Sequence, residues 1–141
     1  MRISARNQFE GTVKSVTDGA VNSIVAIEVG SSVIKANITS EAVKDLGLAT
    51  GGKAVAIVKA TNVVFASGSA KIAGISARNQ IAGKVVSVTE GAVNSHVVLE
   101  TVDGLRICGS ITNEAVESLG FAVGSDAVAL IKSTDVIVGV E

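Results

Sequence analysis

Apolar and polar residues alternate in the first regular segment of the chain. Phe9, Gly11 and Val13 lie on one side of it, and Glu10 and Thr12 lie on the other. A period of two is typical of a half-buried β-strand. Apolar and β-branched runs predict four more strands, at residues 23–29, 33–38, 54–58 and 63–65.

The period changes between the third and the fourth of these strands. Thr39-Ser40-Glu41 has the composition of a helix N-cap with an acidic first turn, and Gly47 is a typical helix stop. This spacing predicts about two helical turns. Five strands with one helix before the fourth are typical of a small OB-like Greek-key barrel.

The whole pattern occurs twice. Residues 1–66 and 73–141 align with one inserted residue in the second copy, and residues 67–72 form a short linker that begins with small polar residues. The second copy repeats the helix start as Thr112-Asn113-Glu114. We therefore predict a mainly β protein with two tandem OB-like Greek-key β-barrels, each with one short α-helix.

The strands are unusually apolar for such small barrels. Val55-Ala56-Ile57-Val58 has no polar face, and a unit of about 65 residues buries little surface alone. Strands of this kind need cover on both sides, which predicts a subunit interface.

Composition narrows the class of function. The chain has 141 residues, is 48% hydrophobic and carries a formal net charge of −1. Nonspecific binding to nucleic acid or to a membrane requires a basic excess, so neither partner is expected. The single cysteine, Cys108, excludes an internal disulfide and fits a reducing compartment. No run has the length of a signal peptide core or a membrane span, so we expect a soluble, cytoplasmic protein.

Comparison of the two copies shows which polar residues both retained. Of 12 Lys and Arg, only Arg6/Arg78 and Lys59/Lys132 remain basic in both copies. Lys44, for example, aligns with Glu117. Retained guanidinium and ammonium groups indicate an oxyanion site. The alternative is structural, with Arg6 and Lys59 paired to Glu28 and Glu41.

Several hydroxyl and amide positions are retained as well, and each has a structural alternative. Thr39 and its counterpart Thr112 are predicted to cap helices, a role compatible with anion contact. Asn22 and Asn94 are predicted to occupy a turn with positive φ, and anion contact is the alternative.

No catalytic or cation-binding constellation is repeated. His96 aligns with Ile24, and Cys108 aligns with no cysteine. A Cys/His nucleophile or a cation site shared by both copies is therefore excluded. We predict a binding protein, not an enzyme, with no catalytic cofactor.

The ordered set of motifs closely resembles the Mop domain, or molbindin, over essentially the whole chain and twice. The motifs are Ser-Ala-Arg-Asn-Gln before a strand, then Gly-Ala-Val-Asn-Ser, then Ile-Thr before the helix, and Lys-Ala or Lys-Ser before the last strand. Two copies are similar to the cytoplasmic molybdate-binding proteins of the ModG type. The resemblance implies a homotrimer that binds molybdate or tungstate between domains.

The resemblance also implies the site residues. The main site takes the Ser and Arg of the first motif, the Thr before the helix, and the Lys with the residue after it. In this sequence these residues are Ser4, Arg6, Thr39, Lys59, Ala60, Ser76, Arg78, Thr112, Lys132 and Ser133. A second class of site is assigned to two turns, composed of Val21, Asn22, Ser23, Val93, Asn94 and Ser95.

The implied function is storage, buffering and homeostasis of intracellular molybdenum, bound as molybdate and not as a metal cation. Ser, Thr, Arg and Lys all donate hydrogen bonds, which suits a fully deprotonated dianion. The alternative is an oxyanion-responsive oligomerisation or sensor module that acts on a separate partner protein. An OB-fold nucleic-acid binder is disfavoured because the chain has only three aromatic residues.

Overall fold

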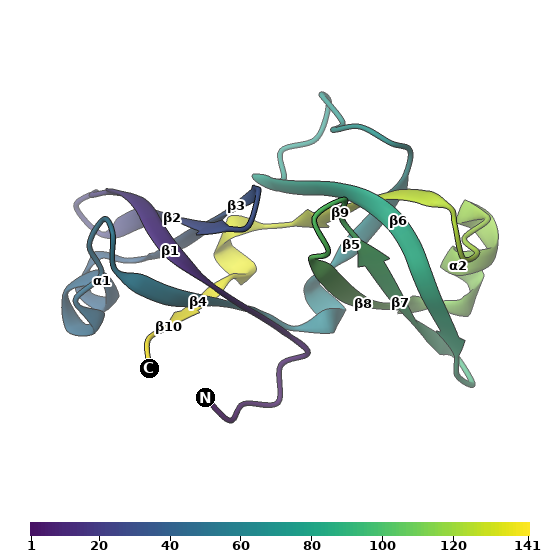
Figure 1. Ribbon diagram of the computed structural model, residues 1–141, viewed down its shortest axis with the longest axis horizontal. Coiled ribbons are helices and arrows are strands. Elements are labelled where there is room, and N and C mark those ends of the chain that lie inside the picture. Colours follow the sequence, from purple (N-terminus) through teal and green to yellow (C-terminus); the bar gives the residue numbers. More distant parts are fainter. The chain divides into compact units, whose positions relative to one another are not determined.

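The computed structural model describes all residues from 1 to 141, and it is mostly β (Figure 1). Two compact units are present. The first comprises Met1–Val58 and Lys132–Glu141, and the second comprises Lys59–Ile131. Each unit has one five-stranded sheet and one short helix, which confirms the predicted fold class.

The first unit has an antiparallel sheet in the order β10-β4-β1-β2-β3. The edge strands β10 and β3 approach each other, so the sheet curls into a nearly closed barrel. Its elements are β1 (Asn7–Thr17), β2 (Asn22–Val29), β3 (Ser32–Thr39), α1 (Ser40–Leu46), β4 (Lys53–Val58), the 3-10 turn η2 (Ser133–Asp135) and β10 (Ile137–Gly139).

The second unit has the equivalent sheet in the order β5-β9-β6-β7-β8. Its edge strands β5 and β8 are also close to each other. Its elements are the 3-10 turn η1 (Ala60–Asn62), β5 (Val64–Ser67), β6 (Asn79–Glu90), β7 (Asn94–Glu100), β8 (Arg106–Thr112), α2 (Asn113–Leu119) and β9 (Asp126–Ile131).

Each unit takes its fifth strand from the other repeat. β5 belongs to the first repeat but pairs with β9, and β10 belongs to the second repeat but pairs with β4. The predicted boundaries 1–66, 67–72 and 73–141 therefore describe the repeats of the sequence and not the compact units. Hydrophobic periodicity identifies strands, but it does not identify which of two equivalent partners each strand chooses.

The first strand of each repeat is long and bent. β1 pairs with β4 up to Thr12 and with β2 from Thr12 onwards. Its register shifts between Val13 and Ser15, as expected for a bulge, and such a bulge bends the strand. Gly11 lies at this bend, where a Cβ would collide with the backbone oxygen of Glu28. The bend lets one strand serve two sides of a small barrel.

β4 is buried on both faces within a single chain. Val55, Ala56, Ile57 and Val58 are each at most 5% exposed. The cover that this strand needs is therefore present in one copy of the chain, and the sequence argument from β4 to a subunit interface fails. No helix of the chain is both long and apolar enough to cross a membrane.

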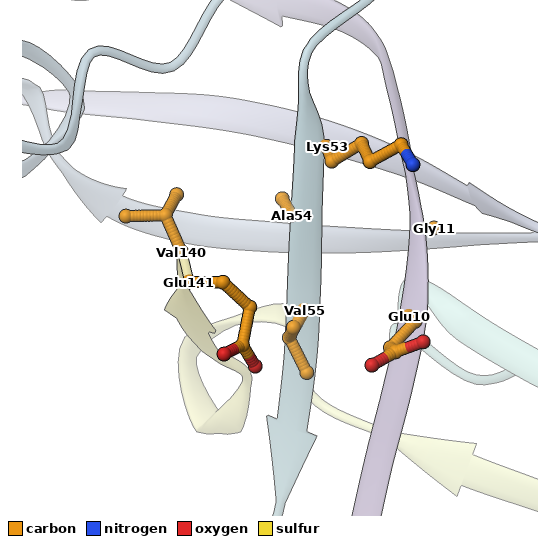
Figure 2. Close-up of a pocket in the computed structure, with 7 residues that line it drawn as sticks. All are labelled: Glu10, Gly11, Lys53, Ala54, Val55, Val140 and Glu141. Atoms are coloured by element: carbon orange, nitrogen blue, oxygen red, sulfur yellow. The ribbon is translucent and has the colours of Figure 1, made fainter. Parts of the chain in front are cut away.

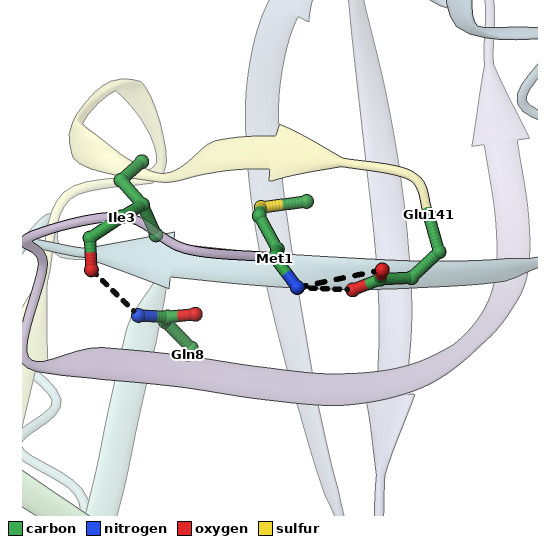
Figure 3. Close-up of polar contacts among 4 residues, drawn as sticks. All are labelled: Met1, Ile3, Gln8 and Glu141. Carbon is green, nitrogen blue, oxygen red and sulfur yellow. Dashed lines mark hydrogen bonds and ion pairs between the residues drawn. The ribbon is translucent and has the colours of Figure 1, made fainter.

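Both ends of the chain lie in the first unit. The N-terminal ammonium of Met1 lies 3.1 Å from Oε1 of Glu141, and Figure 3 shows this ion pair above β1. The Met1 side chain also reaches β10, since its Cε would lie 2.6 Å from a Cβ built on Gly139. The segment before β1 is thereby fixed to the sheet.

Candidate functional site

In the repeated Ser-Ala-Arg-Asn-Gln motif, some side chains are buried or hydrogen-bonded within the chain and others are exposed. Asn7 is 2% exposed. Nε2 of Gln8 donates to the carbonyl oxygens of Ile3 at 3.1 Å and Ala5 at 3.0 Å (Figure 3), so it folds the segment back on itself. Ser4 and Arg6 remain exposed and form no hydrogen bond with the chain.

The second copy of the motif has the same division. Nε2 of Gln80 donates to the carbonyl oxygen of Ile72 at 3.1 Å, and the N–H of Ile72 donates to Oε1 of Gln80 at 2.8 Å. Asn79 is 2% exposed. Ser76 and Arg78 are exposed, as Ser4 and Arg6 are. The retained glutamine amides therefore hold the backbone, the retained asparagines are buried, and the retained Ser and Arg are exposed.

The four retained cations form no ion pair. Arg6, Lys59, Arg78 and Lys132 are all exposed and have no carboxylate partner. The structural alternative, in which Arg6 and Lys59 pair with Glu28 and Glu41, is therefore wrong. By contrast, two cations that were not retained between the repeats are paired, Lys84 with Asp126 and Arg106 with Glu100, each at 2.7 Å.

The register brings the retained cations of different repeats to one end of each sheet. In the first unit, Asn7 pairs with Val58 and Ile137 pairs with Ile57. The segments that precede β1 and β10 therefore enter at the same end. We call this the cation end of the first unit. Ser4 and Arg6 precede β1 there, Lys59 directly follows Val58, the register partner of Asn7, and Lys132 and Ser133 precede β10.

The second unit has an equivalent cation end. Asn79 pairs with Ile131, and Val64 pairs with Leu130. At the cation end of the second unit, Ser76 and Arg78 precede β6, Lys132 directly follows Ile131, the register partner of Asn79, and Lys59 and Ala60 precede β5. One difference is that η2 contains Asp135 where η1 has Asn62, so only the first unit has a carboxylate in its 3-10 turn.

The threonines of the predicted site lie at the opposite end of each unit. β1 runs from Asn7 at the cation end to Thr17 beside Ile24, and Asn22 pairs with Thr39. Figure 1 shows α1 and the start of β1 at opposite ends of the first unit. At about 3.3 Å per residue, the two ends are roughly 30 Å apart along β1. Arg6 and Thr39 of one unit therefore do not share a ligand.

Thr39 and Thr112 cap their helices as predicted. Each hydroxyl oxygen accepts a hydrogen bond from a backbone N–H three residues later, Ala42 and Ala115 respectively, at 3.1 Å. Each O–H still has its own hydrogen to donate. Both side chains are exposed. Capping and anion contact are therefore compatible at these positions.

The turns assigned to a second class of site pack against the helix starts. The N–H of Ser40 donates to the carbonyl oxygen of Val21 at 2.8 Å, and Asn113 and Val93 make the same bond. Asn22 and Asn94 are exposed, but neither has positive φ, so this part of the prediction is wrong. Both asparagines instead begin a strand, which explains their extended backbone.

The serines of these turns are used internally. Ser23 is 1% exposed, and its Oγ lies 2.8 Å from Oγ of Ser40, which donates to the carbonyl oxygen of Gly19. Ser95 is equally buried and donates to Oδ1 of Asn113 at 2.5 Å. These hydroxyls stabilise the helix end of each unit. The sequence did not reveal the roles of Ser40 and Asn113, because the two repeats carry different residue types there.

Two surface cavities lie in the first unit, and neither contains the retained cations. One of about 450 Å³ is lined by Glu10, Lys53, Val55 and Glu141 among others. Figure 2 shows the two carboxylates on either side of Val55. Two carboxylates disfavour a dianion. The other cavity, of about 710 Å³, lies between the β1–β2 turn and α1 and includes Asp18 and Lys44.

The remaining reactive side chains do not cluster. No group of three or more His, Cys, Asp or Glu could hold a metal ion. Nδ1 of His96 is buried without a hydrogen-bond partner. It pairs across the sheet with Ser110, and its counterpart in the first unit is Ile24.

Comparison with known proteins identifies related chains. The TOBE domain model matches residues 3–65 and 75–138. The chain is 39% identical over 142 residues to the molybdenum transport protein ModE of Herbaspirillum seropedicae, with 100% of this chain and 52% of ModE covered. It is also 39% identical over 139 residues to the molybdenum-pterin-binding protein MopA of Rhodobacter capsulatus, covering 97% of this chain and 52% of MopA. The chain thus spans about half the length of these relatives.

A solved structure matches over the full length of both chains. A crystal structure of the cytoplasmic molybdate-binding protein ModG, with molybdate bound, superposes with a TM-score of 0.94 at 42% identity and 100% coverage of each chain.

Proposed function

The chain belongs to the TOBE domain family and contains two copies of the domain, and from this premise we propose that it binds molybdate, and also tungstate, at the two cation ends. The role is storage and buffering of the oxyanion within the cytoplasm, without catalysis. The observation that carries the proposal is that all four retained cations are exposed and form no ion pair. A cation that two diverged repeats keep, and that no carboxylate neutralises, is available for an anionic ligand.

The chemistry of these residues suits a tetrahedral dianion. Arg6 and Arg78 supply charged donors at the cation ends of the first and second units, and Ser4 and Ser76 supply hydroxyl donors there. Further donors come from the segments that follow β4 and β9, which carry Lys59, Lys132 and Ser133. Ala60 is 8% exposed and has no polar side-chain atom, so it contributes through its backbone only.

We propose that the threonines contribute from a second copy of the chain. Because Thr39 and Arg6 lie at opposite ends of one unit, they do not contact the same ligand within that unit. Val21, Asn22 and their counterparts remain the proposed second class of site, through backbone groups and the exposed amides.

We propose further that copies of the chain assemble into a homotrimer. Three exposed apolar side chains recur at equivalent positions of both repeats: Ile3 and Ile75, Val21 and Val93, and Val64 and Ile137. Retained, exposed apolar residues favour an interface. Sedimentation at low micromolar concentration should give three times the chain mass. The double variant Val64→Asp, Ile137→Asp should reduce it, whereas Val102→Asp, at an exposed residue without a repeated counterpart, should not.

One observation favours a second candidate function. In ModE the matching region makes up about half of a longer protein, so this module also occurs joined to other sequence. A sensor role through a separate partner would follow if anion binding changes the affinity for such a partner.

Analysis of the molybdenum content of the purified protein, together with its mass in solution, tests the proposed function. We expect molybdenum to be retained through gel filtration in proportion to the protein, up to saturation. A protein that is purified from molybdate-supplied cells without molybdenum, and that takes up none on addition of molybdate, would contradict the proposal.

A further inference from the structure

We propose that the core of each unit is shaped to accept only the fifth strand of the other repeat, so that side-chain size encodes the strand exchange. In each unit the fifth strand fills the groove between the strand it pairs with and the opposite edge strand. In the second unit, β5 fills the groove between β9 and β8 and carries Phe65. In the first unit, β10 fills the groove between β4 and β3 and carries Val138. Both side chains are buried, at 6% and 8% exposure.

Backbone pairing does not distinguish the two strands. Phe65 pairs with Ala129, and Val138 pairs with Ala56. Ala129 and Ala56 are equivalent residues of the two repeats, so both strands enter their grooves in the same register. Any preference for one groove over the other must therefore come from the side chains.

The groove of the second unit fits a phenylalanine. A Cβ added to Gly109 on β8 would lie 2.8 Å from Cζ of Phe65 and closer still to Cε2. The ring of Phe65 meets the ring of Phe121 edge to face, with centroids 6.0 Å apart and an interplanar angle of 87°. The absence of a side chain at Gly109 is thus what makes room for the ring.

The first unit carries the complementary set of sizes. The counterparts of Gly109, Phe65 and Phe121 are Ala36, Val138 and Leu48. Ala36 is fully buried and Leu48 is 8% exposed. One unit therefore combines glycine with two large rings, and the other combines alanine with two aliphatic side chains.

Crossed pairing fails in both directions. Phe65 in the groove of the first unit would meet the methyl group of Ala36 where its ring needs space, and overpacking of this kind is destabilising. Val138 in the groove of the second unit would leave a void above Gly109, which is also destabilising.

The size match does not rest on the proposed function, and its test needs no ligand.

The first test asks whether Gly109→Ala raises or lowers the melting temperature. Gly109 does not have positive φ, so without the size match the replacement of this strand glycine by alanine should raise the melting temperature. If the size match holds, Gly109→Ala lowers it instead, by roughly 5 °C. Adding Phe65→Val, which recreates the pair of the first unit, should recover at least half of the loss. A higher melting temperature for Gly109→Ala alone would overturn the proposal.

The second test asks which partner the strands choose. A reporter for the exchanged form joins Ser67→Cys to Ala127→Cys, because these residues are register partners. A reporter for the unexchanged form joins Ser67→Cys to Ala54→Cys, at the counterpart of Ala127. Both use the Cys108→Ser background. The native core should cross-link only the first reporter on mild oxidation.

Exchanging the two strand residues should reverse this result. In Phe65→Val, Val138→Phe, each strand fits the groove of its own repeat, so the second reporter should cross-link and the first should not. A folded variant that still cross-links only the first reporter would overturn the proposal. If this variant does not fold, the sign of the Gly109→Ala change decides.

Discussion

The two ends of each unit use their polar residues differently. At the helix end, hydroxyls and amides are consumed by the protein itself, since Ser23 contacts Ser40 and Ser95 donates to Asn113. At the cation end, Ser4 and Arg6 have no partner within the chain. Retention between the repeats is thus not sufficient to identify a ligand site. Retention combined with the absence of an internal partner is more selective.

The most direct test of this difference between the two ends is to remove a cation from the cation end. Arg6→Ala and Arg78→Ala should each weaken one class of molybdate site by about 1.5–3 kcal/mol, the value of a hydrogen bond to a charged group. The melting temperature without anion should barely change, because neither side chain forms a hydrogen bond or an ion pair within the chain. Calorimetric titration with molybdate measures the first effect and differential scanning calorimetry measures the second.

Cations outside the cation ends provide matched controls. Lys84→Ala and Arg106→Ala remove surface groups that are paired with carboxylates, and Lys44→Ala removes a cation that is not retained. All three should leave molybdate affinity unchanged. Equal losses from these variants and from the arginine variants would mean that general charge, and not a site, attracts the anion.

The helix end should give the reverse result. Ser95→Ala leaves the half-buried Oδ1 of Asn113 without its donor, and an unsatisfied group costs about 1–3 kcal/mol of stability. Affinity for molybdate should be unchanged. Chemical denaturation and titration of the same variant provide the two readouts. A loss of binding without a loss of stability would assign Ser95 to the second class of site after all.

A smaller effect is expected at the helix caps, where the two roles overlap. Thr39→Ala should cost about 1 kcal/mol of stability through loss of the cap, and binding should weaken because the O–H donor is also lost. Thr39→Ser retains both groups and should restore both properties. If serine restores stability but not binding, then the methyl group of Thr39 shapes the site.

Much of this architecture could be predicted from sequence. The strands, the helices and their Thr caps follow from local periodicity and capping chemistry, and the motifs predicted the family to which the chain belongs. The exchange of β5 and β10 could not be predicted from periodicity. The two repeats differ in a compensating way at two aligned pairs of positions, Gly109/Ala36 and Phe65/Val138. This size difference is the sequence feature that could have indicated the exchange.

The site residues were predictable as candidates but not as a spatial group. The sequence shows that Arg6, Thr39 and Lys59 belong to one repeat, whereas the structure places Arg6 and Thr39 at opposite ends of a unit and Lys59 at the boundary between the units, directly after the register partner of Asn7. Distance along a bent strand and exchange between units are tertiary properties. Neither leaves a local pattern in the sequence.

Calorimetric titration of the anion-free protein with molybdate and with phosphate tests the central claim most directly. If all the groups that contact the anion are donors, molybdate binds as a complete dianion, whereas the proton of hydrogen phosphate finds no acceptor, at a cost of about 1–3 kcal/mol. Tungstate should follow molybdate, sulfate should be well behind, and phosphate should be last. Phosphate binding as tightly as molybdate would contradict the account, and would mean that an acceptor such as Asp135 belongs to the site.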